Sequence, residues 1–393
     1  MPTLRTFLSG ADVVFPDRVA SGLTLVLEGD RIVDLTSGPR ELGSHETRVD
    51  LTSQLLVPGF VDVHVHGLLG VDVLDGPEAV IAVARQLPRF GVTAFCPTSV
   101  ACPAEPLATF LDAVRAARVL AEPGAARVLP AHLESNFINP GFAGAQPREW
   151  IHDPQHRERD FSLILSLILD RRADVGVLTM APEMPGGMDL LRAAIDAGIR
   201  VSLGHSGATF EQAMEAISLG ARHATHLFNR MSPMTHREPG LVGAILSSDE
   251  VAAEIICDGH HVHPAVVRAA IAAKGHSRVM AITDGTAGAG LPVGACARLG
   301  GQTITVADVA RLDDGKLAGS VATMDRVFGM LVARAGQSLV EAATLCSTTP
   351  ARELGLTGLG VIARGNLADL VALTPDLRVA GTWVGGHRVT GIA

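Results

Sequence analysis

From residue 58 to about residue 354, short apolar runs alternate with longer amphipathic stretches. The short runs are rich in β-branched and aliphatic residues, which favour strands, whereas the longer stretches repeat apolar residues every three or four positions, as helices do. Eight short runs occur, at residues 58–65, 93–98, 129–134, 175–182, 199–205, 223–228, 253–258 and 279–284. Helical patterns between them include residues 77–87, 106–120, 209–220 and 264–274. Eight strand–helix units predict an α/β fold, a (β/α)8 TIM-type barrel with its chemistry at the C-terminal ends of the strands.

The two ends of the chain follow another pattern, in which short strand-like runs are separated by turns. Residues 24–35 show it near the start and residues 378–391 show it near the end. Because both ends have the same character, we expect them to meet in one small β-sandwich domain made of residues 1–57 and 355–393. The barrel would then occupy residues 58–354. A doubly wound open sheet is the alternative for this central part, but neither GxGxxG nor a Walker loop follows the first strand.

Composition narrows the range of functions. Hydrophobic residues make up 47% of the 393 residues and charged residues 19%, which is enough for a large folded core. The longest apolar run, residues 161–169, is far shorter than the roughly 20 residues of a membrane-spanning helix, so it predicts a buried helix. The net charge is −9 without any basic block, which argues against nucleic acid and anionic membrane surfaces as partners.

Cysteine usage indicates the compartment. The five cysteines are scattered, odd in number and without a CxxC pair. Reduced thiols in a cytoplasm fit this pattern better than a disulfide framework or a thiolate zinc site. The first 17 residues lack an uninterrupted apolar segment, so no secretory signal is apparent. We therefore expect a cytoplasmic protein whose partner is a small molecule.

Imidazole and carboxylate side chains stand where the predicted strands end. Residues i and i+2 of one strand point to the same face, so His64 and His66 would aim two imidazoles at one point. The third, fifth, sixth and eighth runs end in Glu134, His205, His226 and Asp284. Taken singly, each could be a hydrogen-bonded core histidine or a helix cap. Together at one rim of a barrel, they predict a nitrogen and oxygen site for Zn²⁺, Fe²⁺ or a similar divalent ion.

This constellation resembles the amidohydrolase superfamily, in which HxH follows the first barrel strand and an aspartate follows the eighth. Longer words narrow the resemblance to the N-acetylglucosamine-6-phosphate deacetylase family: "HLES", "GHSGAT", "THLFNRMSP", "HREPGLVGA", "DGHHVHP", "ITDG" and "LAGS", in this order before about residue 320. Relatives that bridge two metals with a carboxylated lysine on the fourth strand are excluded, because no lysine precedes Lys274. The resemblance implies hydrolysis of an N-acetylated phosphosugar by a homodimer.

The resemblance also implies that the chain binds one or two divalent ions, Zn²⁺ or Fe²⁺. The ion site that the family shares corresponds to Glu134, His205 and His226. Members that retain the HxH pair hold a second ion, so His64 and His66 imply one here, with Asp284 near it. Asp284 would take a proton from the attacking water and return it to the departing amine.

Substrate contacts are implied residue by residue. Backbone amides of Asn229 and Arg230 would face the ligand. Arg237 and His261 would meet the phosphate, with Arg237 reaching in from a neighbouring subunit. The remaining implied contacts, a substrate-contacting pair and a loop over the sugar, are Ala145, Gln146, Leu317, Ala318 and Gly319.

Departures from the family pattern bear on the choice of sugar. Ser135 and Asn136 stand beside a metal ligand, and Arg230 replaces a common alanine. The same reaction on another amino-sugar phosphate, such as N-acetylgalactosamine 6-phosphate, is the nearest alternative. A catalytically silent barrel scaffold is an alternative of a different class, although such proteins tend to lose metal ligands and this chain has all six. A cyclic amidase or nucleobase deaminase would leave Arg237 and His261 unexplained, and no HxE…CxxC signature occurs.

Overall fold

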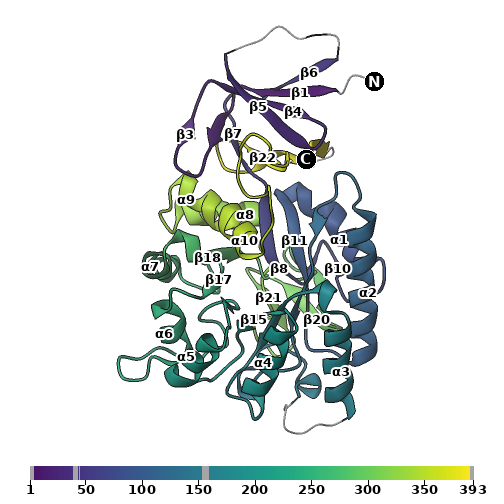
Figure 1. Cartoon of the computed structure of the whole chain (residues 1–393), viewed down its shortest axis with the longest axis vertical. Coiled ribbons are helices and arrows are strands. Elements are labelled where there is room, and N and C mark those ends of the chain that lie inside the picture. The colour runs from purple at the N-terminus through teal and green to yellow at the C-terminus, as the bar shows by residue number, and fades with distance from the viewer. Residues whose placement is uncertain (1–3, 39–42, 44, 153–158, 390–393) are drawn as a thin grey trace.

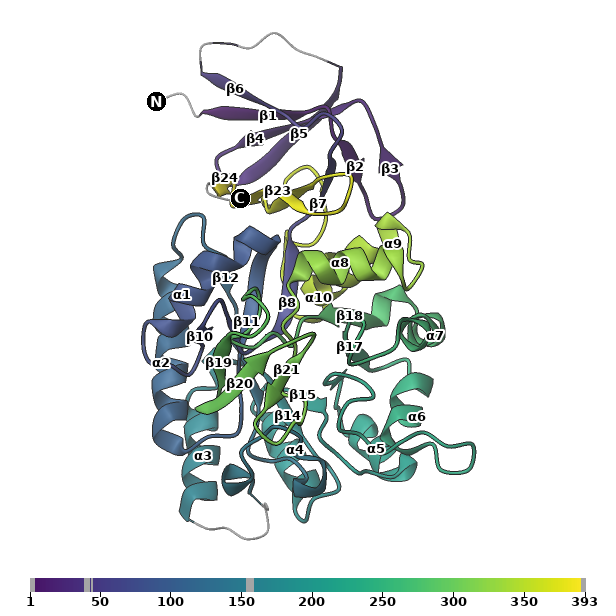
Figure 2. The ribbon, with the colours of Figure 1, turned by 180° about the vertical axis from the view of Figure 1, so that it is seen from behind.

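A barrel of parallel strands forms the larger part of the molecule (Figures 1 and 2). The structure, a computed structural model, describes residues 4–38, 43, 45–152 and 159–389. All eight predicted strands are present, which confirms the barrel. They are β8 (Phe60–Val65), β11 (Val92–Ser99), β13 (Ala131–Glu134), β14 (Val175–Met180), β15 (Arg200–Leu203), β16 (His223–Ala224), β17 (Ala252–Ile256) and β18 (Val279–Ile282).

The barrel strands pair in parallel, in the order in which they occur along the chain. β8 pairs with β11, β11 with β13, and the ladder continues strand by strand to β18. Within the described residues, an isolated bridge between Val65 and Gly285 joins the two ends of this series. The His66 N–H strengthens the junction by donating to the Gly285 carbonyl at 2.8 Å. Strands buried on both faces have nearly continuous apolar sequences, which is why the sequence pattern predicted them.

A helix follows each barrel strand and packs on the outside of the barrel. These helices are α1 (Ala79–Gln86), α2 (Ala104–Leu120), α3 (Arg159–Asp170), α4 (Gly187–Asp196), α5 (Phe210–Ser218), α6 (Gly240–Ser247), α7 (Pro264–Lys274) and α8 (Met324–Ala333). Their apolar faces share one large core cluster with the strands. The apolar run 161–169 lies in α3, as predicted. In the part of the chain that the structure describes, no helix has the length and apolar character needed to cross a membrane.

Shorter helical segments complete the barrel domain. Near the end of the chain, α9 (Leu339–Ala343), a π-helical turn (Thr344–Thr348) and α10 (Thr349–Glu353) follow one another without a break. Ala351 belongs to the apolar cluster inside the barrel, and Leu354 and Leu356 pack against it, which closes the end of the barrel opposite the predicted site. The short 3₁₀ turns are Leu87–Phe90, Pro140–Phe142, Arg148–Trp150, Arg172–Asp174 and His276–Arg278.

Two further sheets form the small β domain at the top of Figure 1. One contains β1 (Arg5–Ser9), β4 (Leu23–Glu28), β5 (Arg31–Ser37) and β6 (Glu46–Asp50). The other contains β2 (Asp12–Val14), β3 (Val19–Ala20), β7 (Leu55–Pro58), β22 (Leu370–Leu373), β23 (Val379–Val384) and β24 (His387–Val389). Antiparallel pairing of β7 with β22 places Pro58 opposite Leu370, so the two ends of the chain meet as predicted. Buried Trp383 lies in their shared core. The boundaries at residues 57 and 355 stay a prediction.

Several small strands outside the eight barrel strands were not predicted. β9 (Gly67–Leu68) and β10 (Val71–Asp72) follow the first barrel strand, β12 (Arg127–Val128) extends the sheet beside β11, and a three-stranded sheet follows β18 (Figure 2). The three-stranded sheet contains β19 (Cys296–Leu299), β20 (Gln302–Val306) and β21 (Ala310–Leu312). Gly300 N–H donates to Asp72 at 2.7 Å and the Gln302 amide donates to the Ala145 carbonyl at 2.8 Å, which fixes this sheet against the mouth.

Candidate metal centre and active site

The six predicted ligands converge at the C-terminal ends of the barrel strands. His64 lies within β8 and Glu134 ends β13, whereas His66, His205, His226 and Asp284 follow the ends of β8, β15, β16 and β18. Five of the six line one cavity of about 420 Å³. His64 is fully buried just beneath it. Side chains that are far apart in the sequence therefore meet at one rim of the barrel, as the strand ends predicted.

Glu134 is the centre of the first group. Its Oε1 lies 2.8 Å from His205 Nε2 and 2.6 Å from His226 Nε2. The two ring nitrogens are 3.1 Å apart. Two nitrogens and one oxygen thus face a common point, in the arrangement that a divalent ion with nitrogen and oxygen ligands requires.

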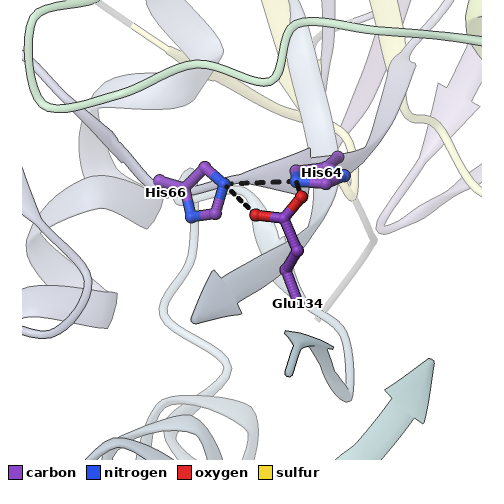
Figure 3. A group of neighbouring side chains, drawn as sticks. All are labelled: His64, His66 and Glu134. Carbon is purple, nitrogen blue, oxygen red and sulfur yellow. Dashed lines mark hydrogen bonds and ion pairs between the residues drawn. The ribbon is translucent and has the colours of Figure 1, made fainter. Parts of the chain in front are cut away.

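The HxH pair forms a second group beside the first (Figure 3). His64 Nε2 and His66 Nε2 are 3.2 Å apart, and Figure 3 shows both rings pointing toward the Glu134 carboxylate. The second carboxylate oxygen, Glu134 Oε2, lies 3.4 Å from His66 Nε2. Asp284 Oδ1 lies 3.3 Å from both ring nitrogens. Glu134 therefore has one oxygen in each group.

The backbone at three of these strand ends is strained. His205, His226 and Asp284 have φ values of 47°, 30° and 50°, in the left-handed region that residues other than glycine seldom adopt. Each such residue costs on the order of 1–3 kcal/mol, and strain of this kind concentrates at functional sites. The strain turns the side chains from the strand ends toward the shared point.

Electrostatics at the site favour a cation. Burial alone would lower the pKa of His66, but Asp284 and Glu134 raise it to about 10. Burial would also lower the pKa of His226, but the hydrogen bond and the charge of Glu134 outweigh burial and raise this pKa to about 9. Burial would raise the pKa of Glu134, but His205 and His226 hold it well below its usual range. The two carboxylates therefore stabilise positive charge at this point, carried either by protons on the imidazoles or by a divalent ion that would replace those protons.

Hydrogen bonds behind the rings orient them. His66 Nδ1–H donates to the Thr98 carbonyl at 3.0 Å and His205 Nδ1–H donates to the Phe142 carbonyl at 2.8 Å. A ring that gives its one proton to Nδ1 presents the lone pair of Nε2 to the cavity, as a metal ligand requires. The donor set and its orientation suit a divalent metal ion.

Sequence reasoning missed one acidic side chain of this region. Glu254, on β17, is fully buried, and its Oε2 accepts from His64 Nδ1 at 3.0 Å. Burial raises its pKa, although His132 and His226 act against this. The signal was available, because a glutamate within the apolar segment "AEIICD" must face either the core or a partner.

The predicted substrate contacts divide into two sets. Those that line the cavity are Ala145, Gln146, Asn229, Arg230, His261, Leu317 and Gly319. Ala318 does not line it, because this residue is fully buried and its N–H donates to the Ala310 carbonyl at 3.0 Å. Arg237 is exposed and lies outside the lining of its own chain's cavity, so its contact through a second subunit stays a prediction.

Basic side chains lie at the part of the cavity formed after β16 and β17. His261 Nδ1 is held by Asp258 Oδ2 at 2.6 Å, which leaves its Nε2 available. Arg230 approaches residue 144 so closely that a Cβ there would lie 2.7 Å from its Nε, and Gly144 provides the space. Among the described side chains, Arg230 has neither an ion pair nor a hydrogen bond from its guanidinium. An anionic group can therefore bind there without first breaking an internal pair.

Such a metal-suited centre at the mouth of a (β/α)8 barrel defines a class of hydrolases. Residues 55–389 match the amidohydrolase family, and the chain belongs to this family.

Within that class, the relatives are amino-sugar phosphate deacetylases. The chain is 33% identical over 374 residues to N-acetylglucosamine-6-phosphate deacetylase of Bacillus subtilis (strain 168), covering 94% of this chain and 93% of that protein. It is 35% identical over 337 residues to N-acetylgalactosamine-6-phosphate deacetylase of Escherichia coli O157:H7, covering 85% and 88%. The crystal structure of N-acetylglucosamine-6-phosphate deacetylase from Pasteurella multocida has a TM-score of 0.89 at 29% identity and covers 99% of this chain and 100% of that one.

Proposed function

We propose that this protein hydrolyses the acetamide of N-acetylglucosamine 6-phosphate, releasing acetate and glucosamine 6-phosphate. One observation carries the proposal: four imidazoles and two carboxylates face one point of a cavity whose other lining includes an unpaired arginine. Such a cavity can hold an amide at the carboxylate end and a phosphate at the basic end. The names of the relatives support the same substrate class.

The ions in this proposal are Zn²⁺ or Fe²⁺. Glu134, His205 and His226 would hold one, and His64 and His66 a second, with Asp284 beside it. When bound, a divalent ion would polarise the amide carbonyl and lower the pKa of a water molecule to roughly 7.

Asp284 is the proton carrier of the reaction. Burial would raise its pKa, but His64 and His66 hold it below its usual range, so the side chain is ionised and has the form that can accept a proton. It takes the proton of the attacking water and gives it to the amine nitrogen as the carbon–nitrogen bond breaks. Water oxygen and one hydrogen thus leave in acetic acid, and the other hydrogen leaves on the amine.

The cavity residues divide the work of binding. Ala145 and Gln146 flank the acetyl end, and Leu317 with Gly319 covers the sugar. The side chains of Arg230 and His261, together with the backbone of Asn229, bind the phosphate. In the same proposal the protein is a cytoplasmic homodimer. Arg237 of each subunit reaches the phosphate of the substrate bound in the other subunit's cavity.

The epimer is a separate question, because one relative is an N-acetylgalactosamine-6-phosphate deacetylase. The test is acetate release by the metal-reconstituted protein from both phosphorylated epimers and from unphosphorylated N-acetylglucosamine. We expect the highest kcat/KM with N-acetylglucosamine 6-phosphate and the lowest with the unphosphorylated sugar. A higher kcat/KM with the galacto epimer would replace the proposed substrate, and no acetate from any of the three would reject the function.

The side chain of Arg230 should contribute to phosphate binding. An Arg230→Ala variant loses a charge-assisted hydrogen bond, so we expect about a tenfold increase in KM for the phosphorylated sugar with little change in kcat. Arg268→Ala, on the exposed face of α7, is the control. Steady-state acetate release measures both. An equal loss of kcat/KM with the unphosphorylated sugar would show that the guanidinium does not recognise phosphate.

A further inference from the structure

Glu254 lies in an unfavourable place for a carboxylate. It belongs to β17 and points into the barrel with Ala252 and Ile256, two members of the apolar cluster inside the barrel. Its side chain is fully buried. Burying an unpaired charge costs several kcal/mol, so this glutamate needs partners that compensate for the loss of water.

Its partners are imidazoles rather than lysine or arginine. Oε2 accepts from His64 Nδ1 at 3.0 Å and, at the longer distance of 3.4 Å, from the backbone N–H of His226. Oε1 lies 3.7 Å from His132 Nδ1, which itself donates to the Val63 carbonyl at 3.1 Å. No hydrogen-bond donor reaches Oε1 from the residues that the structure describes. The interaction of Glu254 is therefore concentrated on one ring, that of His64.

This contact decides which nitrogen of His64 carries the proton. A neutral imidazole has a single N–H, and a carboxylate behind Nδ1 keeps the proton on that nitrogen by accepting its hydrogen bond. The lone pair then lies on Nε2, which faces His66 Nε2 at 3.2 Å and Asp284 Oδ1 at 3.3 Å. With the opposite tautomer, His64 would present an N–H to the site and could not bind an ion.

His64 differs in this respect from the other rings of the site. His66 and His205 are held by neutral backbone carbonyls, of Thr98 and Phe142. His226 Nδ1 has no hydrogen-bond partner among the described residues. A carboxylate behind a ligating ring also makes the ring a stronger donor than a carbonyl does. The effect of Glu254 should therefore be confined to the ion held by the HxH pair.

We propose that Glu254 is a positioning residue that fixes the tautomer of His64, so that the chain binds an ion at His64 and His66 in addition to the one at Glu134, His205 and His226. Glu254 touches neither the substrate nor the ion and acts through His64 alone. The inference deepens the proposed function, but the uptake of ions can be measured whether or not the protein releases acetate.

The experiment is a Zn²⁺ titration of the metal-free full-length chain against a chromophoric chelator, with total zinc counted by mass spectrometry. Glu254→Gln keeps the shape of the side chain but can accept from or donate to His64, so both tautomers become accessible. We expect two ions per wild-type chain. In the variant we expect a 10- to 100-fold weaker affinity for one ion and an unchanged affinity for the other. Asp325→Asn, which neutralises a buried carboxylate on α8, is the matched control and should bind both ions normally.

A cycle with His64→Asn separates positioning from general stabilisation. If Glu254 acts through His64, adding Glu254→Gln to His64→Asn should not weaken zinc binding further. If Glu254→Gln does not fold, Glu254→Asp takes its place, because the shorter carboxylate keeps the charge but withdraws from His64 Nδ1. Wild-type affinities in the folded Glu254 variant, equal weakening of both ions, or a wild-type chain that binds one ion would each overturn the proposal. Failure of the proposed substrate would instead appear as normal ion binding without acetate release.

Discussion

Replacing Asp284 with asparagine should leave ion binding largely intact and lower kcat by about 10²- to 10⁴-fold. Asp284 is the acidic side chain of the cavity that can both accept the proton of water and return it to the amine. Glu134 cannot share this task, because both of its oxygens face ring nitrogens. Asparagine has nearly the same shape but does not exchange a proton near neutral pH. The loss should therefore fall on kcat rather than on KM.

Acetate release and zinc content, measured on the same preparation, check this prediction. Asp189→Asn, at an exposed position on α4, controls for the substitution itself. A kcat within a factor of three of wild type, with ions bound, would remove Asp284 from the proposed mechanism. Loss of the ions together with the activity would make Asp284 a ligand first and leave the proton carrier unassigned.

Replacing Glu134 with glutamine should abolish ion binding in both groups. One Glu134 oxygen faces His205 and His226 and the other faces His66, so this carboxylate joins the two groups. An amide brings no charge and turns an N–H toward ring nitrogens, which repels the ion as well. Because the ion contributes several kcal/mol to the transition state, kcat/KM should fall about a thousandfold or more.

Mass spectrometry of bound zinc and circular dichroism of the folded chain measure this outcome. Glu122→Gln, whose carboxylate pairs with Arg85 on the surface, is the control and should keep both ions. A Glu134→Gln chain that retains two ions with wild-type affinity would show that the two groups do not share this carboxylate.

The barrel could be predicted because its strands are buried on both faces and its helices are amphipathic. The sheet β19–β21 was missed, although Gly300 and Gly301 between β19 and β20 both have positive φ, as a two-residue hairpin turn requires. Glycine pairs between short alternating runs signal such a hairpin. The apolar run in α3 could be predicted to form a helix of the folded domain and not a membrane span, because it is far shorter than a membrane-spanning helix.

The candidate site was likewise predicted in part and missed in part. Strand-end positions identified all six converging side chains, because a polar residue after a buried strand lies at the barrel rim. Glu254 was missed because it lies in the middle of an apolar strand and not at its end. A glutamate in that position signals a buried polar contact, but the sequence does not show that the partner is His64. Ala318 is buried and Arg237 lies outside its own cavity, and neither position follows from local sequence because each depends on how a long loop packs.

The central claim is that ions held by these side chains enable the chain to hydrolyse an acetamide. Its most direct test is acetate release from N-acetylglucosamine 6-phosphate while the metal-free protein is titrated with Zn²⁺. The account predicts no turnover without zinc, and turnover that rises in proportion to bound zinc until the sites are full. Full turnover in the presence of excess chelator, or zinc-loaded protein that releases no acetate, would contradict it.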